Sequence, residues 1–92
     1  MATLHMDTEQ VKATQAKMNE SHGAMTQSLT DTANSISSTV GAAWVGNSAN
    51  EFQSEFEQLR GQISQQLEQL QELTAKLQAE IAQWEEMAAR LG

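Results

Sequence analysis

The feature that most constrains this chain is an apolar residue at every seventh position across its second half. This row comprises Phe56, Ile63, Leu70, Leu77, Trp84 and Leu91. Positions flanking the row add Phe52, Leu59, Leu67, Leu73, Ile81 and Met87. A sustained seven-residue period keeps one helix face against a partner helix, as in a coiled coil. The chain also contains no proline, the residue that most strongly interrupts a helix. The pattern therefore predicts a helix from about residue 48 to about residue 90.

A weaker apolar stripe runs along the first half of the chain. It comprises Leu4, Val11, Met18 and Met25, then Leu29, Ile36 and Ala43, with Ala33 and Val40 one helical turn away. Asp7, followed three residues later by Gln10, is typical of a helix N-terminal capping box. We therefore expect a helix from about residue 8 to about residue 41. Because Gly23 and many serines and threonines lower its helix propensity, this helix should depend on packing.

The two helical patterns are separated by a short segment that contains Gly41, Trp44 and Gly46. Glycine is the favoured residue just past a helix end, and Ser48 with Glu51 forms a second capping-box pattern. We therefore expect a turn over about residues 42–47. Because a short connection makes two helices antiparallel neighbours, the sequence predicts an all-α fold. Residues 1–92 would form a single domain, a two-helix antiparallel hairpin.

A hairpin of this kind leaves apolar surface uncovered. Each helix buries only one side of its stripe, and the end of the second helix should project past the start of the first. Uncovered apolar stripes favour association, and a chain of 92 residues is marginal as a monomer. We therefore expect two hairpins to form a four-helix bundle. A homodimer is the simplest arrangement, and a heterodimer with a related chain is the alternative.

Composition excludes several classes of function. The net charge is −7, which disfavours nucleic acid and anionic lipid as partners. No apolar run is long enough to span a bilayer, so stable membrane insertion is not expected. Polar residues throughout positions 1–20 leave no apolar segment for a cleavable signal peptide. We therefore expect neither a cleavable signal peptide nor a segment that spans the membrane.

No chemistry is indicated by the side chains. Cysteine is absent, and the two histidines, His5 and His22, are seventeen residues apart, or about 25 Å along one helix. Acidic pairs such as Glu51 with Glu55 lack a nucleophile or a metal-ligand set beside them and suggest a solvated helix face. No phosphate-binding loop or catalytic triad is present. We expect no catalysis, no metal and no cofactor.

Trp44-Val45-Gly46, placed between two long helices near the middle of a chain of this length, resembles the signature of the WXG family, also called Esx-like. The resemblance covers the whole chain. It implies a helical hairpin that dimerises and is exported by a bacterial type VII secretion system. It further implies recognition by the membrane-bound ATPase of that system. The recognition signal would combine Trp44 and Gly46 of one chain with the C-terminal tail of its partner.

The tail departs from the pattern of many family members, which carry a Tyr-x-x-x-Asp/Glu motif there. This chain has no tyrosine. Trp84 supplies an aromatic ring, but the residue four positions later is Ala88. The candidates for a degenerate tail signal are therefore Trp84, Glu85, Glu86 and Leu91. The departure leaves open whether the chain or its partner carries the signal.

The resemblance implies a secreted, extracellular substrate or carrier that acts through protein–protein interaction. Two other classes compete with this interpretation. An intracellular coiled-coil adaptor, or structural interaction module, would share the helices but would not be exported. A membrane-active amphipathic protein would need a basic polar face, which this acidic chain lacks.

Overall fold

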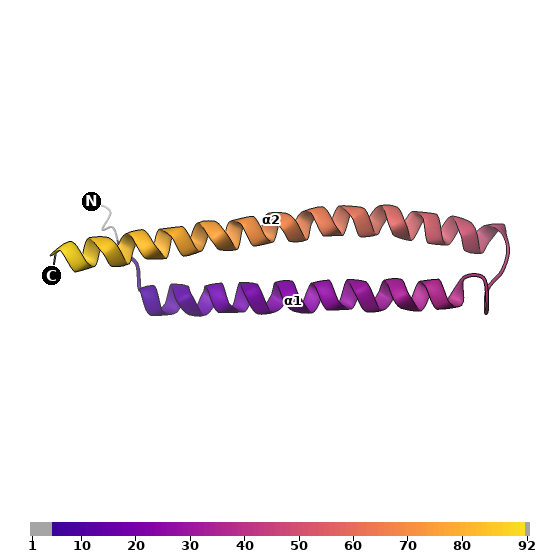
Figure 1. The fold of residues 1–92 in the computed structure, drawn as a ribbon, viewed down its shortest axis with the longest axis horizontal. Coiled ribbons are helices and arrows are strands. Elements are labelled where there is room, and N and C mark those ends of the chain that lie inside the picture. Colours follow the sequence, from indigo (N-terminus) through magenta and orange to yellow (C-terminus); the bar gives the residue numbers. More distant parts are fainter. Residues whose placement is uncertain (1–4, 92) are drawn as a thin grey trace.

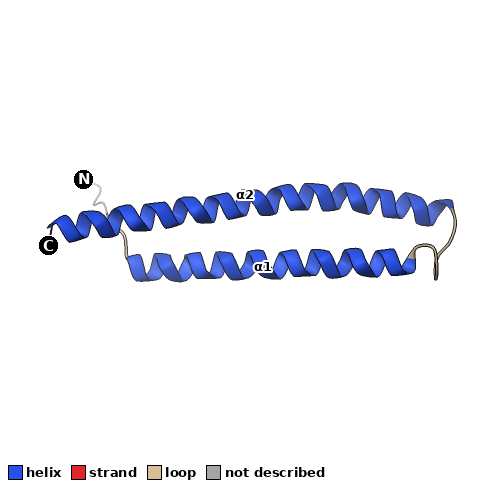
Figure 2. Ribbon diagram, viewed as in Figure 1, coloured by secondary structure: helices blue, strands red, loops and turns tan. Residues whose placement is uncertain are grey.

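Two long helices lie side by side in a computed structural model that describes residues 5–91 (Figure 1). Helix α1 spans Thr8–Thr39 and helix α2 spans Asn47–Leu91. The molecule measures 68 × 21 × 19 Å. Figure 2 shows helices and connecting loops, with no strand in the described part of the chain. The predicted all-α hairpin is confirmed.

Glycine backbone conformations set the ends of the helices at the turn. Helix α1 ends at Thr39, two residues earlier than expected, because Gly41 adopts φ +93°, which a right-handed helix cannot contain. Gly46 has φ +132°, and its carbonyl accepts the Asn50 N–H at 3.1 Å, the first backbone hydrogen bond of α2. Ser48 therefore lies inside α2 and not at its N-cap, so that part of the prediction was wrong.

The predicted cap at the start of α1 does form. The Asp7 side chain accepts the backbone N–H of Gln10 at 3.2 Å, which satisfies one of the free donors at a helix N-terminus. Val11 then donates its N–H to the Asp7 carbonyl at 3.0 Å. The short acidic side chain thus fixes where the first helix begins.

Two rows of α2 residues face α1, and we call them the inner seam. The first row is the one predicted from the sequence, extended at its start by Ala49. The second row contains polar as well as apolar residues. The inner seam comprises Ala49, Phe56, Ile63, Leu70, Leu77 and Trp84 in the first row, and Gln53, Arg60, Leu67, Thr74 and Ile81 in the second; all are buried or half-buried. Ile81 is the most buried large side chain, at 1% exposure.

Helix α1 meets the inner seam with a less regular set of smaller residues. Its buried or half-buried members include Val11, Gln15, Met18, His22, Leu29, Ala33, Ile36 and the C-cap Val40. Ala43, expected in this stripe, lies instead in the turn and is exposed, since the helix ends before it. Leu4 lies outside the described residues. The apolar stripe of α1 thus changes its spacing near Leu29 and Ala33.

Two polar contacts fix the alignment of the helices. The Gln15 side-chain amide donates to the Gln78 side-chain oxygen, and the Lys12 ammonium pairs with the Glu85 carboxylate. Both contacts join the first half of α1 to the last third of α2. The end of α2 extends past the start of α1 (Figure 1), and Leu91 is 86% exposed there.

Candidate functional site

The turn is a small hydrogen-bonded structure that holds Trp44 at the tip of the hairpin. The Thr39 carbonyl accepts the N–H groups of Ala43 and Trp44, each at 3.0 Å. The Gly41 N–H donates to the Trp44 carbonyl at 2.9 Å. These bonds use carbonyls and amides that the end of α1 would otherwise leave free. The backbone of Trp44 is therefore tied to the end of α1 through both its N–H and its carbonyl.

Trp44 packs on the beginning of α2 by one side only. Its ring centroid lies 5.4 Å from that of Phe52, with 49° between the ring planes, a favourable tilted aromatic arrangement. Trp44 is still 40% exposed and the neighbouring Val45 is 75% exposed. Trp44 therefore covers part of the open end of the hairpin and leaves an apolar edge exposed.

Gly46 is required by the backbone and not by close packing. Its φ of +132° is one that other residues rarely adopt. A Cβ built at this position would meet no atom within 4 Å. The glycine therefore allows the chain to reverse direction between Trp44 and α2. Of the two fixed residues of the motif, Trp44 supplies exposed apolar surface and Gly46 supplies the turn.

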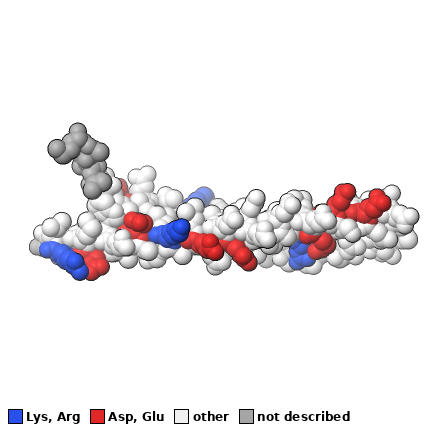
Figure 3. Space-filling model, turned by 90° about the horizontal axis from the view of Figure 1, so that it is seen from above, with Lys and Arg blue, Asp and Glu red and all other residues white. Residues whose placement is uncertain are grey.

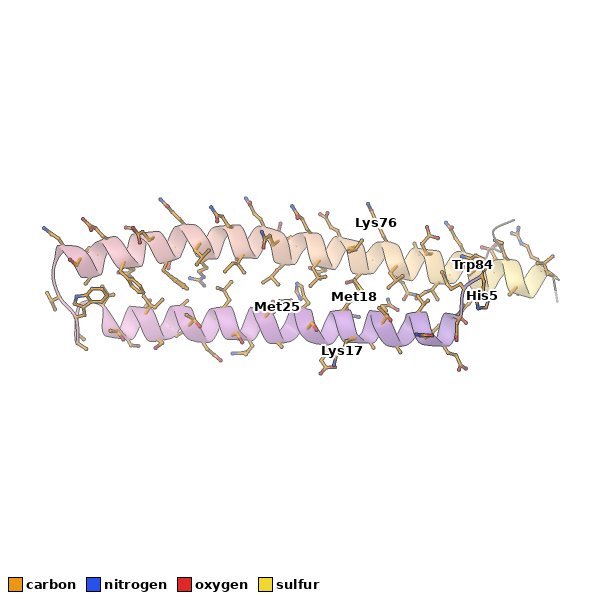
Figure 4. The ribbon with its side chains drawn as sticks, turned by 180° about the vertical axis from the view of Figure 1, so that it is seen from behind. His5, Lys17, Met18, Met25, Lys76 and Trp84 are labelled. Atoms are coloured by element: carbon orange, nitrogen blue, oxygen red, sulfur yellow. The ribbon has the colours of Figure 1, made fainter. Side chains whose placement is uncertain are left out.

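The four tail candidates have different surroundings. Trp84 is half-buried at the end of the inner seam, and Figure 4 shows it at the same end of the hairpin as His5. Glu85 pairs with Lys12 of α1, while Glu86 accepts from Arg90 at 2.7 Å within α2. Leu91 has no comparable cover. Two of the candidates thus have structural partners of their own.

The turn and the tail lie at opposite ends of the hairpin (Figure 1). Since the molecule is 68 Å long, Trp44 and Leu91 of one chain are not neighbours. The structure of a single chain therefore does not assemble the two predicted halves of the recognition element.

A further apolar row on α2 is not covered by α1, and we call it the outer row. It consists of every seventh residue from position 52, namely Phe52, Leu59, Gln66, Leu73, Glu80 and Met87. Its four apolar members are 45–57% exposed. These four residues and the pair Leu67 and Ile81 flank the predicted seven-residue row on opposite sides. Only Leu67 and Ile81 are buried, so α1 covers one side of the apolar stripe and leaves the other side exposed.

Polar residues do not separate the outer row from the inner seam. Gln66 and Glu80 interrupt the outer row, but Gln53, Arg60 and Thr74 interrupt the second row of the inner seam and are half-buried or buried. The sequence pattern therefore does not indicate which row α1 covers.

Two open apolar grooves border the outer row. One, of about 410 Å³, lies between the helices beside Met25, Leu29, Phe56 and Leu59. The other, of about 340 Å³, lies beside Met18, Leu73 and Leu77. Met18 and Met25 point from α1 toward α2, while Lys17 points away (Figure 4). The side of the hairpin that carries the outer row is therefore both apolar and indented.

The charged side chains of residues 5–91 do not gather into a candidate metal centre. In the part of the chain that the structure describes, no three His, Asp or Glu residues are placed to hold a metal ion. Figure 3 shows acidic and basic side chains spread along the whole length of the surface. Neither helix, over residues 5–91, combines the length and the apolar character needed to cross a bilayer.

One comparison with known proteins identifies a relationship. The model of the WXG100 family, described as proteins of 100 residues with WXG, matches residues 3–86. No curated protein and no solved structure matches the chain at a significant level. The matched region includes α1, the turn and most of α2.

Proposed function

Because this chain belongs to the WXG100 family, we propose that it is a secreted Esx-like protein exported by a bacterial type VII secretion system. Membership itself implies a small helical protein associated with type VII secretion. The finer proposal is that the chain is a substrate or carrier that acts by binding other proteins. The observation that carries it is the exposed Trp44 edge, held by a closed turn at the tip of the hairpin.

Residues 1–92 would act as one unit in this role. A carrier needs surfaces that bind other proteins and does not need a catalytic site. The proposed binding surfaces are Trp44 at the tip of the hairpin and the outer row of α2. Members of the family typically form dimers. We propose a homodimer for this chain because one side of the hairpin is apolar, indented and uncovered.

The membrane-bound ATPase of the secretion system would bind Trp44 and Gly46 together with the tail of the partner chain. Trp84, Glu85, Glu86 and Leu91 are the tail residues proposed for this contact. Leu91 is the best placed of these, because it is 86% exposed. Glu85 and Glu86 already pair with Lys12 and Arg90, and Trp84 is half-buried. No tyrosine is needed if these groups supply the apolar and acidic contacts.

An export assay tests the proposal. The tagged chain is expressed in a bacterium that has a type VII system, and in the same strain without its ATPase. Appearance in the medium only with the ATPase supports the proposal. Retention inside the cell in both strains supports the alternative, an intracellular coiled-coil adaptor.

A variant pair then tests the role of the turn. Trp44→Ala should abolish export while the purified protein keeps its helical circular dichroism. Trp44→Phe, which retains an aromatic ring against Phe52, should retain part of the export. Unchanged export of Trp44→Ala would remove Trp44 from the recognition element.

A further inference from the structure

We propose that helix α1 consists of two separately stabilised segments, and that opening of the second segment releases Trp44 from the turn. The first segment comprises residues 8–22 and the second comprises residues 23–39. The proposal rests on the recognition role proposed above for Trp44 and adds a conformational control of that residue.

Contact between the two helices is interrupted after His22. The next buried or half-buried residue of α1 is Leu29, so residues 23–28 are all exposed. An open groove of about 410 Å³ lies beside this stretch. Gly23 begins the stretch, and glycine is less favourable than alanine inside a helix. The middle of α1 therefore gains little support from either packing or helix propensity.

The first segment is held on α2 by specific contacts. The Gln15 side chain donates to Gln78, and the Lys12 ammonium pairs with Glu85. Ile81, which is 1% exposed, lies on α2 between these two contacts. Polar pairing and the most buried large side chain of the described residues thus coincide at this end of the hairpin.

The second segment meets a more polar part of α2. Its buried or half-buried residues are Leu29, Ala33 and Ile36. Toward the turn, the second row of the inner seam consists of Gln53 and Arg60, which are both half-buried. Within the described residues, the side chains of this segment form their hydrogen bonds inside α1. No polar side-chain contact of the kind made by Gln15 or Lys12 fixes the second segment to α2.

The composition of the second segment weakens the helix itself. Eight of the fourteen residues at positions 26–39 are serine or threonine, which are mediocre helix formers. The hydroxyls of Thr26, Ser38 and Thr39 donate to backbone carbonyls four residues earlier, each at 2.9 Å. This kind of bond slightly destabilises a helix. The second segment can therefore open locally while the first segment and α2 stay helical.

The position of Trp44 depends on the folded end of the second segment. The Thr39 carbonyl accepts the N–H groups of Ala43 and Trp44, whereas the Trp44 ring packs on Phe52 of α2. Opening of residues 23–39 removes the backbone anchor and leaves the indole held by the aromatic contact alone. The folded segment thus presents Trp44 in a defined arrangement at the tip, and the opened segment does not.

Amide hydrogen exchange in a matched pair of glycine variants tests this coupling. Gly23 and Gly61 both lie within helices, and a Cβ added at either position would meet no atom within 4 Å. Gly23→Ala should raise the protection factor of the Trp44 N–H about fivefold, because alanine favours the helical state of the second segment. Gly61→Ala should leave that protection factor unchanged, because α2 stays helical when the second segment opens.

The Ile81 N–H, measured by NMR in the same samples, reports global unfolding. Its protection factor should exceed that of the Trp44 N–H in the unmodified chain, and should rise in both variants. Equal protection of Trp44 by the two substitutions would mean that only global unfolding releases it, which would overturn the proposal. An unchanged Trp44 protection factor in Gly23→Ala would also overturn it, because the turn would then open without the second segment. Neither result bears on the proposed export, which the ATPase-deletion strain tests separately.

Discussion

The indole of Trp44 lies 5.4 Å from the ring of Phe52, tilted by 49°, and this contact joins the turn to the first turns of α2. Trp44 belongs to a loop held by the Thr39 carbonyl, whereas Phe52 belongs to the outer row. The tip of the hairpin and the uncovered apolar face therefore meet at one aromatic pair. A substitution of either ring should therefore affect both the turn and the start of the outer row.

Removing the indole should cost moderate stability. Trp44→Ala loses the aromatic pair, which contributes about 0.5–1.5 kcal/mol beyond area burial, while 40% of the residue is already exposed to water. We expect thermal unfolding, followed by circular dichroism, to shift downward by a few degrees. Trp44→Phe should recover part of the shift. Complete loss of helicity in Trp44→Ala would contradict a merely supporting role for the ring in the fold.

Two glycine substitutions should have opposite signs. Gly46→Ala places a side chain at φ +132° and should destabilise the fold by about 1–2 kcal/mol through backbone strain alone. Gly61→Ala, within α2 and with open space around the new Cβ, should stabilise the helix by about 1 kcal/mol. Urea denaturation of both variants measures the difference. Equal effects would show that the turn tolerates another conformation at Gly46.

The inner seam should respond to small losses of volume. Ile81 is 1% exposed, and Ile81→Val should cost about 1 kcal/mol through the lost methylene and the space that it leaves. Leu91→Ala, at a position 86% exposed, should change the unfolding free energy of the hairpin by less than about 0.5 kcal/mol. Both are measured by urea denaturation at the same protein concentration. A larger effect at Leu91 would mean that a contact between chains covers the tail.

Local sequence signals predicted the cap at the start of α1 and the place of the turn. Asp7 forms its cap because the bond to the Gln10 N–H depends only on residues within one turn. Gly41 and Gly46 mark the break because they alone reach the backbone angles needed there. The helix end at Thr39 and the place of Ser48 inside α2 were missed by one or two residues. Competing local hydrogen bonds, here to the Thr39 carbonyl, decide such details.

The exposure of the outer row does not follow from the sequence pattern. Leu59 and Leu67 are both leucines next to the same seven-residue row, yet one is 54% exposed and the other 8% exposed. The period of the pattern identifies an apolar stripe but not which half of it the neighbouring helix covers. That choice depends on how α1 is rotated about α2, and the smaller residues of α1 leave this rotation weakly specified in sequence.

The sequence by itself determined two helices, their antiparallel connection and the family to which the chain belongs, because helix periodicity, capping and turn glycines act over a few residues. Only the tertiary structure decided which apolar residues face α1, that Trp44 rests on Phe52, and that turn and tail of one chain lie at opposite ends. These relationships join residues far apart in the chain. They depend on how the two helices are rotated against each other, because each helix buries only the side of the other that faces it.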